Sequence, residues 1–442
     1  MRKITFMILL AGFLGSSVMA QNRIEFQEFT LDNGLHVIMH KDNTTPLVVT
    51  SVLYHVGSKN EDPERTGFAH FFEHLLFEGT ENIGRGEYTE IVESAGGSLN
   101  AFTSNDLTYY YELLPSNYLE LSLYLESERM LHAKIDQKGV ETQREVVKEE
   151  KRQRIDNQPY GSIMSETLKR AYSVHPYQWA PIGSLEHLNA ATLEEFRQFY
   201  KDFYVPNNAT LTIAGDIDYD QTEEWVRAYF SEIPKGEQTI YRPEVKEPEK
   251  TEEIRDIVYD NIQIPAVIQA YNIPPKDHPD SYAMSMLSTY LTGGESSLMT
   301  KELVDKQQKA LAVSAFPLDL EDGGLFIMYG IANMGVEAAE LESEIDLLIK
   351  QVQQEGISDR DFQKLQNIIE TDLVSKNASM AGIAQNLAEA QVFYGSTDYI
   401  NQELDKYQEV TKEDIKRVAN EFMTLDGRVV LYYLPKSAET AE

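Results

Sequence analysis

A chain of 442 residues is too long for one typical core, so we expect two or three domains. Its 72 acidic residues against 39 basic ones give a net charge of −33, which argues against nucleic acids and anionic membranes as partners. The chain has no cysteine, which excludes disulfide bonds and thiol chemistry.

The first residues of the chain have the pattern of a secretory signal. Arg2 and Lys3 precede an apolar run at residues 4–14, and a small-x-small sequence ends at Ala20. The apolar run is about half as long as the roughly 20 residues that a membrane span needs. We therefore predict a signal peptide at residues 1–20, export to the periplasm, and no membrane span after cleavage.

Residues 29–39 are predicted as two strands joined by a turn at Asn33-Gly34, and residues 47–56 as a third strand. The first predicted helix follows and carries the sequence His70-Phe-Phe-Glu73-His74. On a helix the two histidines lie one turn apart on one face and can converge on a cation, with Glu73 beside them as a general base. This HxxEH order is a recognised zinc signature, although an ordinary helix can carry it by chance. The motif predicts a zinc site whose third ligand must be His, Asp or Glu, since cysteine is absent.

A charged helix predicted at residues 140–154 supplies a candidate third ligand. Three valines form its narrow apolar stripe, and at about 100° per residue Glu150 falls within that stripe, whereas Glu149 points to one side. Gln143, two turns earlier, projects along nearly the same line and could contact Glu150 or another ligand. Glu150 is therefore the better inward carboxylate, while most acidic residues of this chain are expected on solvated helix faces.

An internal repeat indicates two related halves. A shift of 219 residues aligns residues 192–203 with 411–422, and the same shift places the strand at 210–213 on 429–432. Strands and helices occur in clusters, which indicates an α+β fold. We divide the mature chain into an N-terminal zinc-binding peptidase domain at residues 21–235, a Pro/Glu/Lys-rich linker at 236–250, and a homologous C-terminal domain without a metal site at 251–442.

With these features together, the chain resembles the pitrilysin-like zinc peptidases, also called inverzincins. Residues 67–80 look like that family's zinc helix and residues 144–150 like its second metal segment. The resemblance covers nearly the whole mature chain and is closest to the short two-domain branch, which includes bacterial peptidases and the mitochondrial processing peptidase. It implies two duplicated α/β-sandwich domains with mainly antiparallel sheets, facing each other across a linker.

The resemblance also implies a function and a site. It implies an exported zinc-dependent endopeptidase that cleaves short or unfolded peptides, with one Zn²⁺ per chain bound by His70, His74 and Glu150 and with Glu73 as the catalytic base. An extended substrate is expected to lie along an edge strand that contains Asn100, Ala101, Phe102 and Thr103.

The chain departs from the family pattern at two places, one near the metal site and one in the second half. Gln143 stands where family members often have glutamate, which puts its tuning of the metal in doubt. Leu298 replaces an arginine, and residues 303–313 contain neither the arginine nor the tyrosine that clamp substrate in the family. We therefore expect a homologous subunit that supplies this pair, or a homodimer. The alternative is a non-catalytic structural or assembly subunit of the same fold.

Overall fold

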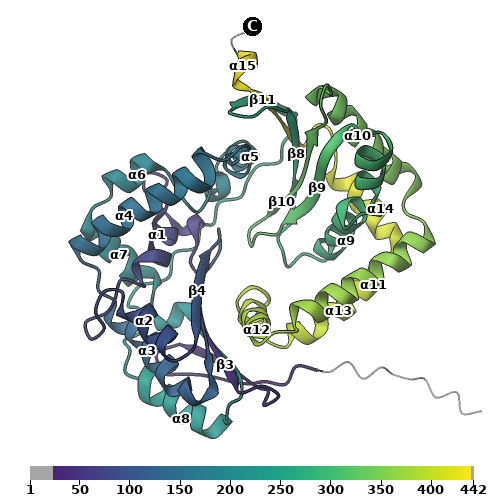
Figure 1. Ribbon diagram of the computed structural model, residues 1–442. Helices are drawn as coiled ribbons and strands as arrows, with labels where there is room; N and C mark the ends of the chain where they lie inside the picture. The colour runs from purple at the N-terminus through teal and green to yellow at the C-terminus, as the bar shows by residue number, and fades with distance from the viewer. Residues whose placement is uncertain (1–22, 440–442) are drawn as a thin grey trace, which may run out of the picture.

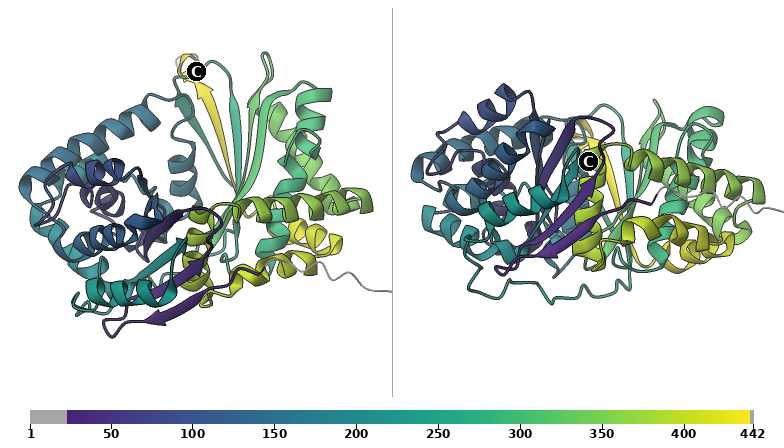
Figure 2. Two further views of the ribbon diagram at one scale, coloured as in Figure 1. Left: turned by 60° about the horizontal axis from the view of Figure 1, so that its bottom comes forward. Right: turned by 90° about the horizontal axis from the view of Figure 1, so that it is seen from below.

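The computed structural model describes residues 23–439, and the predicted signal peptide lies outside this range. The chain forms two lobes, the purple-to-teal lobe of the first half and the green-to-yellow lobe of the second (Figures 1 and 2). Each lobe contains one β-sheet with helices packed against it. Within residues 23–439, no helix combines the length and the apolar character needed to cross a bilayer.

The sheet of the first half has six strands in the order β1-β2-β6-β3-β5-β4. All neighbours are antiparallel except β2 and β6, which are parallel. The strands are β1 Gln27–Thr30, β2 His36–Lys41, β3 Leu47–Tyr54, β4 Ser98–Thr103, β5 Thr108–Pro115 and β6 Ala209–Gly215. The helices of this half are α1 Phe68–Leu75, α2 Glu87–Ser94, α3 Leu119–His132, α4 Gln137–Lys151, α5 Ile163–Ala171, α6 Leu185–Ala190, α7 Leu193–Phe203 and α8 Tyr219–Phe230.

The sheet of the second half has five strands in the order β7-β11-β8-β10-β9, with β7 and β11 parallel and the other pairs antiparallel. The strands are β7 Ile254–Asp260, β8 Ala266–Ile273, β9 Ala310–Leu318, β10 Gly324–Ala332 and β11 Arg428–Pro435. The helices are α9 Asp280–Thr292, α10 Ala338–Glu355, α11 Asp359–Lys376, α12 Met380–Tyr394, α13 Tyr399–Glu409, α14 Lys412–Phe422 and α15 Lys436–Glu439. These two mixed, mostly antiparallel sheets confirm the predicted fold class.

The offset of 219 residues relates whole elements of the two halves. Residues 193 and 203, the ends of α7, correspond to 412 and 422, the ends of α14, and β3 corresponds to β8 in the same way. Both α7 and α14 begin with a capping box, in which Thr192 or Thr411 exchanges hydrogen bonds with the third residue of the helix. The strand order is also the same, with β1 as the additional strand of the first sheet.

One face of each sheet is covered by a helix that belongs to the other half. From the first half, α5 packs through Leu168 against β8 and β11 of the second sheet. From the second half, α12 packs through Ala384 and Leu387 against strands of the first sheet (Figure 1). Because each sheet is covered on one face by a helix of the other half, this exchange joins the halves into one unit.

Candidate metal centre

The helix that carries the HxxEH motif begins at a defined cap. Gly67 adopts a left-handed conformation, with φ of 97°, immediately before α1. The carboxylate of Glu61 accepts hydrogen bonds from the backbone amides of Gly67 and Ala69, each at 2.9 Å, and from the indole of Trp179 at 3.1 Å. Burial raises the pKa of Glu61 to about 8, although the bonds from Gly67 and Ala69 oppose that rise. Glu61 therefore satisfies amides at the helix start that have no partner within the helix.

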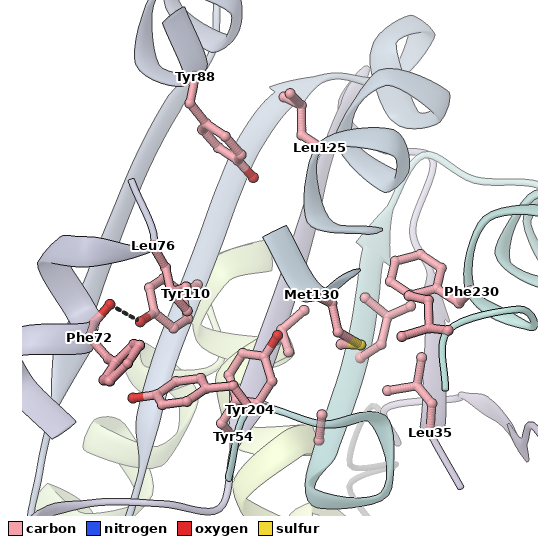
Figure 3. Packing of buried hydrophobic residues seen from close by; sticks show 14 of the residues in the cluster. Leu35, Tyr54, Phe72, Leu76, Tyr88, Tyr110, Leu125, Met130, Tyr204 and Phe230 are labelled. Atoms are coloured by element: carbon pink, nitrogen blue, oxygen red, sulfur yellow. Dashed lines mark hydrogen bonds between the residues drawn. The ribbon is translucent and has the colours of Figure 1, made fainter. Parts of the chain in front are cut away.

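The opposite face of α1 is fixed by aromatic packing. Phe71 and Phe72 are fully buried, and the ring of Phe71 lies 4.4 Å from that of Phe196 on α7. The hydroxyl of Tyr110 on β5 donates to the carbonyl oxygen of Phe72 at 2.8 Å (Figure 3). With this face anchored in the core, the two histidines of α1 face α4.

The structure brings His70, His74 and Glu150 together. Oε2 of Glu150, on α4, lies 3.1 Å from Nε2 of His74 and 3.5 Å from Nε2 of His70. One ligand atom from each residue lies within 4.8 Å of the others, and among residues 23–439 this is the one such group of three. Glu149 instead is exposed and pairs with Arg152 at 3.1 Å.

The chemistry of this group fits a metal ion. His74 Nε2 and Glu150 Oε2 are buried and lie 3.1 Å apart, yet they do not have the geometry of a hydrogen bond to each other or to another group. Such an arrangement is unfavourable for a protein without a ligand. Burial and the neighbouring His74 lower the pKa of His70 to about 4, so its imidazole is neutral at pH 7. Neutral imidazole and carboxylate are the forms that bind zinc.

Glu73 lies in the same cavity, beside the edge strand β4. The hydroxyl of Thr103 donates to Oε2 of Glu73 at 2.7 Å. Burial raises the pKa of Glu73 even though this hydrogen bond lowers it. The cavity has a volume of about 970 Å³, and Asn100, Ala101, Phe102 and Thr103 form one wall of it. β4 pairs with β5 on one side, and its other edge opens on the cavity.

Three further residues at the site were not singled out in the sequence. The amide of Gln143 donates to Glu78, which also pairs with Arg85. Glu78 lies in the turn that follows α1, three residues after its last residue, Leu75, and the sequence carries no periodic signal that singles it out. Arg154 binds Oε1 of Glu150 at 2.7 Å. Phe77 lines the cavity wall next to the histidines.

The corresponding region of the second half has a different character. Leu298, predicted to replace an arginine, is partly buried and packs against the second core. α9 contains no histidine between residues 280 and 292 and buries methionine, leucine and alanine side chains.

Family profiles cover much of the chain. The profile described as "Insulinase (Peptidase family M16)" matches residues 36–179, and the one described as "Peptidase M16 inactive domain" matches residues 190–369. The zinc protease PqqE of Helicobacter pylori is 33% identical over 416 residues, which are 92% of this chain and 93% of that protein.

Solved structures resemble the whole fold. A protease from Helicobacter pylori superimposes with a TM-score of 0.89 at 29% identity, over 93% of this chain and 100% of that one. The first half of the periplasmic protease PqqL from Escherichia coli gives a TM-score of 0.74 at 19% identity, over 94% of this chain and 93% of that one. The match spans 48% of the complete PqqL chain, so this chain has the size of one of its halves.

Proposed function

Because the chain belongs to the M16, or pitrilysin-like, family of zinc peptidases, we propose that it is an exported zinc-dependent endopeptidase that cleaves short or unfolded peptides. The observation that carries the proposal is the convergence of three ligand atoms within 4.8 Å, with Glu73 in the same cavity. His70, His74 and Glu150 would hold one Zn²⁺. Export to the periplasm rests on the signal-like pattern of residues 1–20.

Glu73 is the group that moves protons in this proposal. When bound, zinc supplies Lewis acidity that polarises the scissile carbonyl and the attacking water. Glu73 accepts the proton of that water and delivers it to the leaving amine, which splits the peptide bond into a carboxylate and an amine. Thr103 holds the Glu73 carboxylate through its hydroxyl at 2.7 Å, which orients the base toward the cavity.

The substrate peptide would bind as an added strand on β4. The free edge of β4 offers backbone groups over Asn100 to Thr103, and such pairing gives affinity with little dependence on side chains. This mode suits peptides that are already extended, because a folded protein would first have to release a strand.

We further propose that a second chain of the same fold completes the enzyme. Leu298 and residues 303–313 lack the arginine and tyrosine expected of a substrate clamp. This chain has the size of one half of PqqL, which is consistent with a partner that supplies the other half. The partner is either a homologue that carries the missing pair or a second copy of this chain. Co-purification from the native host, followed by peptide assays with and without the partner, tests this part.

The rival function is a non-catalytic structural subunit. The profile named for an inactive domain matches residues 190–369, a segment that contains none of the three metal-binding candidates, so its name does not describe the part of the chain that carries them. A structural subunit would have no use for a base beside the ligands.

Zinc content and cleavage of a quenched peptide, measured on the mature chain with its partner, decide between these functions. We expect about one zinc per chain and turnover that a chelator abolishes. Glu150→Gln should lose zinc, whereas the matched variant Glu149→Gln, one position away and exposed, should retain it. Zinc without any turnover would favour the structural subunit, and equal zinc loss in both variants would reject Glu150 as a ligand.

A further inference from the structure

A fully buried lysine lies at the junction between the two halves. Lys59, in the short turn η1 Ser58–Asn60, is 1% exposed. Its ammonium lies 3.0 Å from Asp106, 2.5 Å from Glu321 and 3.0 Å from Asp322. A buried ammonium is costly by several kcal/mol unless it is paired, so these carboxylates account for its location. Glu321 and Asp322 belong to the loop between β9 and β10 of the second half, so the ion pairs join the two halves.

The same loop is held by other groups of the first half. His55 Nε2 lies 2.7 Å from Glu321, and His175 Nε2 lies 3.6 Å from Asp322. The backbone amide of Glu321 donates to Asp106 at 3.0 Å, which fixes the loop backbone as well as its side chains. Burial works to raise the pKa of both loop carboxyls. The hydrogen bond from His55 to Glu321, the nearby imidazole of His175 beside Asp322 and the charge of Lys59 hold each pKa at about 2.

The turn around Lys59 also contacts both parts of the candidate active site. The amides of Ser58 and Lys59 donate to the carbonyl oxygens of Ser104 and Asn105, at 3.2 and 3.0 Å, directly after β4 ends. Two residues beyond Lys59, Glu61 caps the start of α1. A single turn thus connects the loop of the second half with the helix that carries the histidines and with the strand that would bind substrate.

We propose that Lys59 is a positioning residue through which the second half fixes the geometry of the active site. By binding Glu321 and Asp322 it holds the turn, and the turn holds α1 and the end of β4, which places Glu73 relative to Thr103. The inference rests on the proposed peptidase function. It assigns the second half, which has no metal site of its own, a direct part in the arrangement of the catalytic groups.

Another ion pair between the halves provides a matched control. Arg170 on α5 donates to Asp256 on β7 at 2.9 and 2.6 Å, and its remaining hydrogen bonds go to Glu166 on its own helix. This pair joins the halves without contact to the turn that supports α1. Its removal should weaken the interface and leave the active site in place.

The experiment compares Glu321→Gln with Asp256→Asn in the zinc-loaded mature chain, with Lys59→Met as a second variant on the opposite side of the junction. Turnover is measured together with the partner chain, and hydrogen exchange is measured on the chain itself. For Glu321→Gln we expect about tenfold lower kcat, about tenfold faster hydrogen exchange of the amides of residues 67–75, and unchanged zinc content. Lys59→Met should show the same effects more strongly. Asp256→Asn should lower the melting temperature, as Glu321→Gln also should, but it should leave kcat and the exchange of residues 67–75 unchanged.

Equal changes of kcat and exchange in Glu321→Gln and Asp256→Asn would overturn the proposal, because Lys59 would then only hold the halves together. No change of exchange in Glu321→Gln and Lys59→Met would overturn it as well. The exchange measurement does not require turnover. If the wild-type chain assayed with its partner cleaves no peptide, the proposed function fails, while faster exchange restricted to the junction variants would still support positioning of α1 by the second half.

Discussion

The two halves of the molecule share a sheet topology, yet within residues 23–439 only the first brings three potential metal ligands together. In the first half, α1 presents His70, Glu73 and His74 beside Glu150, and several of their polar atoms are buried without partners. In the second half, α9 packs against its neighbours through apolar side chains. The comparison teaches that one framework accommodates either content, a cluster of potential metal ligands in the first half or an apolar helix in the second.

Removal of the proposed base, Glu73, should have the largest effect of the changes considered, because it should abolish most of the activity that distinguishes the first half from the second. Glu73→Gln keeps the shape of the side chain and removes its ability to accept a proton, so we expect kcat to fall by about 10³-fold with zinc content unchanged. Quenched-peptide turnover and metal analysis check this. Residual turnover above a tenth of the wild-type value would mean that a group other than Glu73 acts as the base.

The exchanged helix α12 tests whether the halves are separable. Leu387 is fully buried against the first sheet, and Leu387→Ala should lower the free energy of unfolding by about 3 kcal/mol. Leu347→Ala, on α10 with 58% exposure, should change it by less than about 0.5 kcal/mol. Denaturant titration followed by probes in both halves should give one shared transition. Two separate transitions in the Leu387 variant would show that the halves fold independently.

Acid should weaken the junction between the halves. The pKa of Glu321 is lowered from 4.5 to about 2, so its contribution to stability is complete above about pH 4.5 and is lost as the pH falls toward 2. At pH 7 we expect Glu321→Gln to be less stable than wild type by about 1 to 2 kcal/mol, and the difference to shrink by pH 2.5. Unfolding free energies across this range measure it. A difference that stays constant would show that the charge of Glu321 is not involved.

The strand that would bind substrate also orients the base. Thr103→Val retains the β-branched shape but removes the hydroxyl that donates to Glu73, so we expect about a tenfold lower kcat. Thr103→Ser keeps the hydroxyl and should remain within about threefold of wild type. If the serine variant were as impaired as the valine variant, the methyl group rather than the hydrogen bond would be the important part of Thr103.

The smallest expected effect concerns a feature that the halves share. Thr192 and Thr411 cap α7 and α14 with the same reciprocal hydrogen bonds. Replacing either by alanine should lower the free energy of unfolding by about 1 kcal/mol, and the two values should agree within about 0.5 kcal/mol. Thermal or denaturant unfolding checks this. A large difference between the two values would show that the two caps contribute unequally to stability although their hydrogen bonds are the same.

The parts of the fold that follow from local pattern could be predicted from the sequence. The 219-residue repeat located α7 and α14 because a capping box and its apolar spacing are local signals. Helical periodicity predicted the direction in which the Glu150 side chain points from its helix, and the structure places that side chain beside both histidines. The binding of zinc by Glu150 stays a prediction. Membership of the pitrilysin-like family, inferred from the motifs, is confirmed by the match to the Helicobacter pylori protease.

The contacts between distant segments could not be predicted in this way. A lysine is ordinarily exposed, and nothing near Lys59 in the sequence shows that carboxylates more than 260 residues later will surround it. The exchange of α5 and α12 likewise depends on how two sheets approach each other. Glu78 was missed because it lies in the turn after α1, where helical periodicity no longer predicts the direction of a side chain.

The exchange of α5 and α12 also constrains the order in which the chain can acquire its structure. One face of the first sheet, which is complete by residue 215, stays bare until α12 at residues 380–394 has emerged. Contacts over such sequence distances form late, because a long loop must close before they stabilise anything. A chain that emerges from its N-terminus would therefore complete its first half only after most of its length has been made, and the bare face of the first sheet stays exposed to aggregation until α12 arrives.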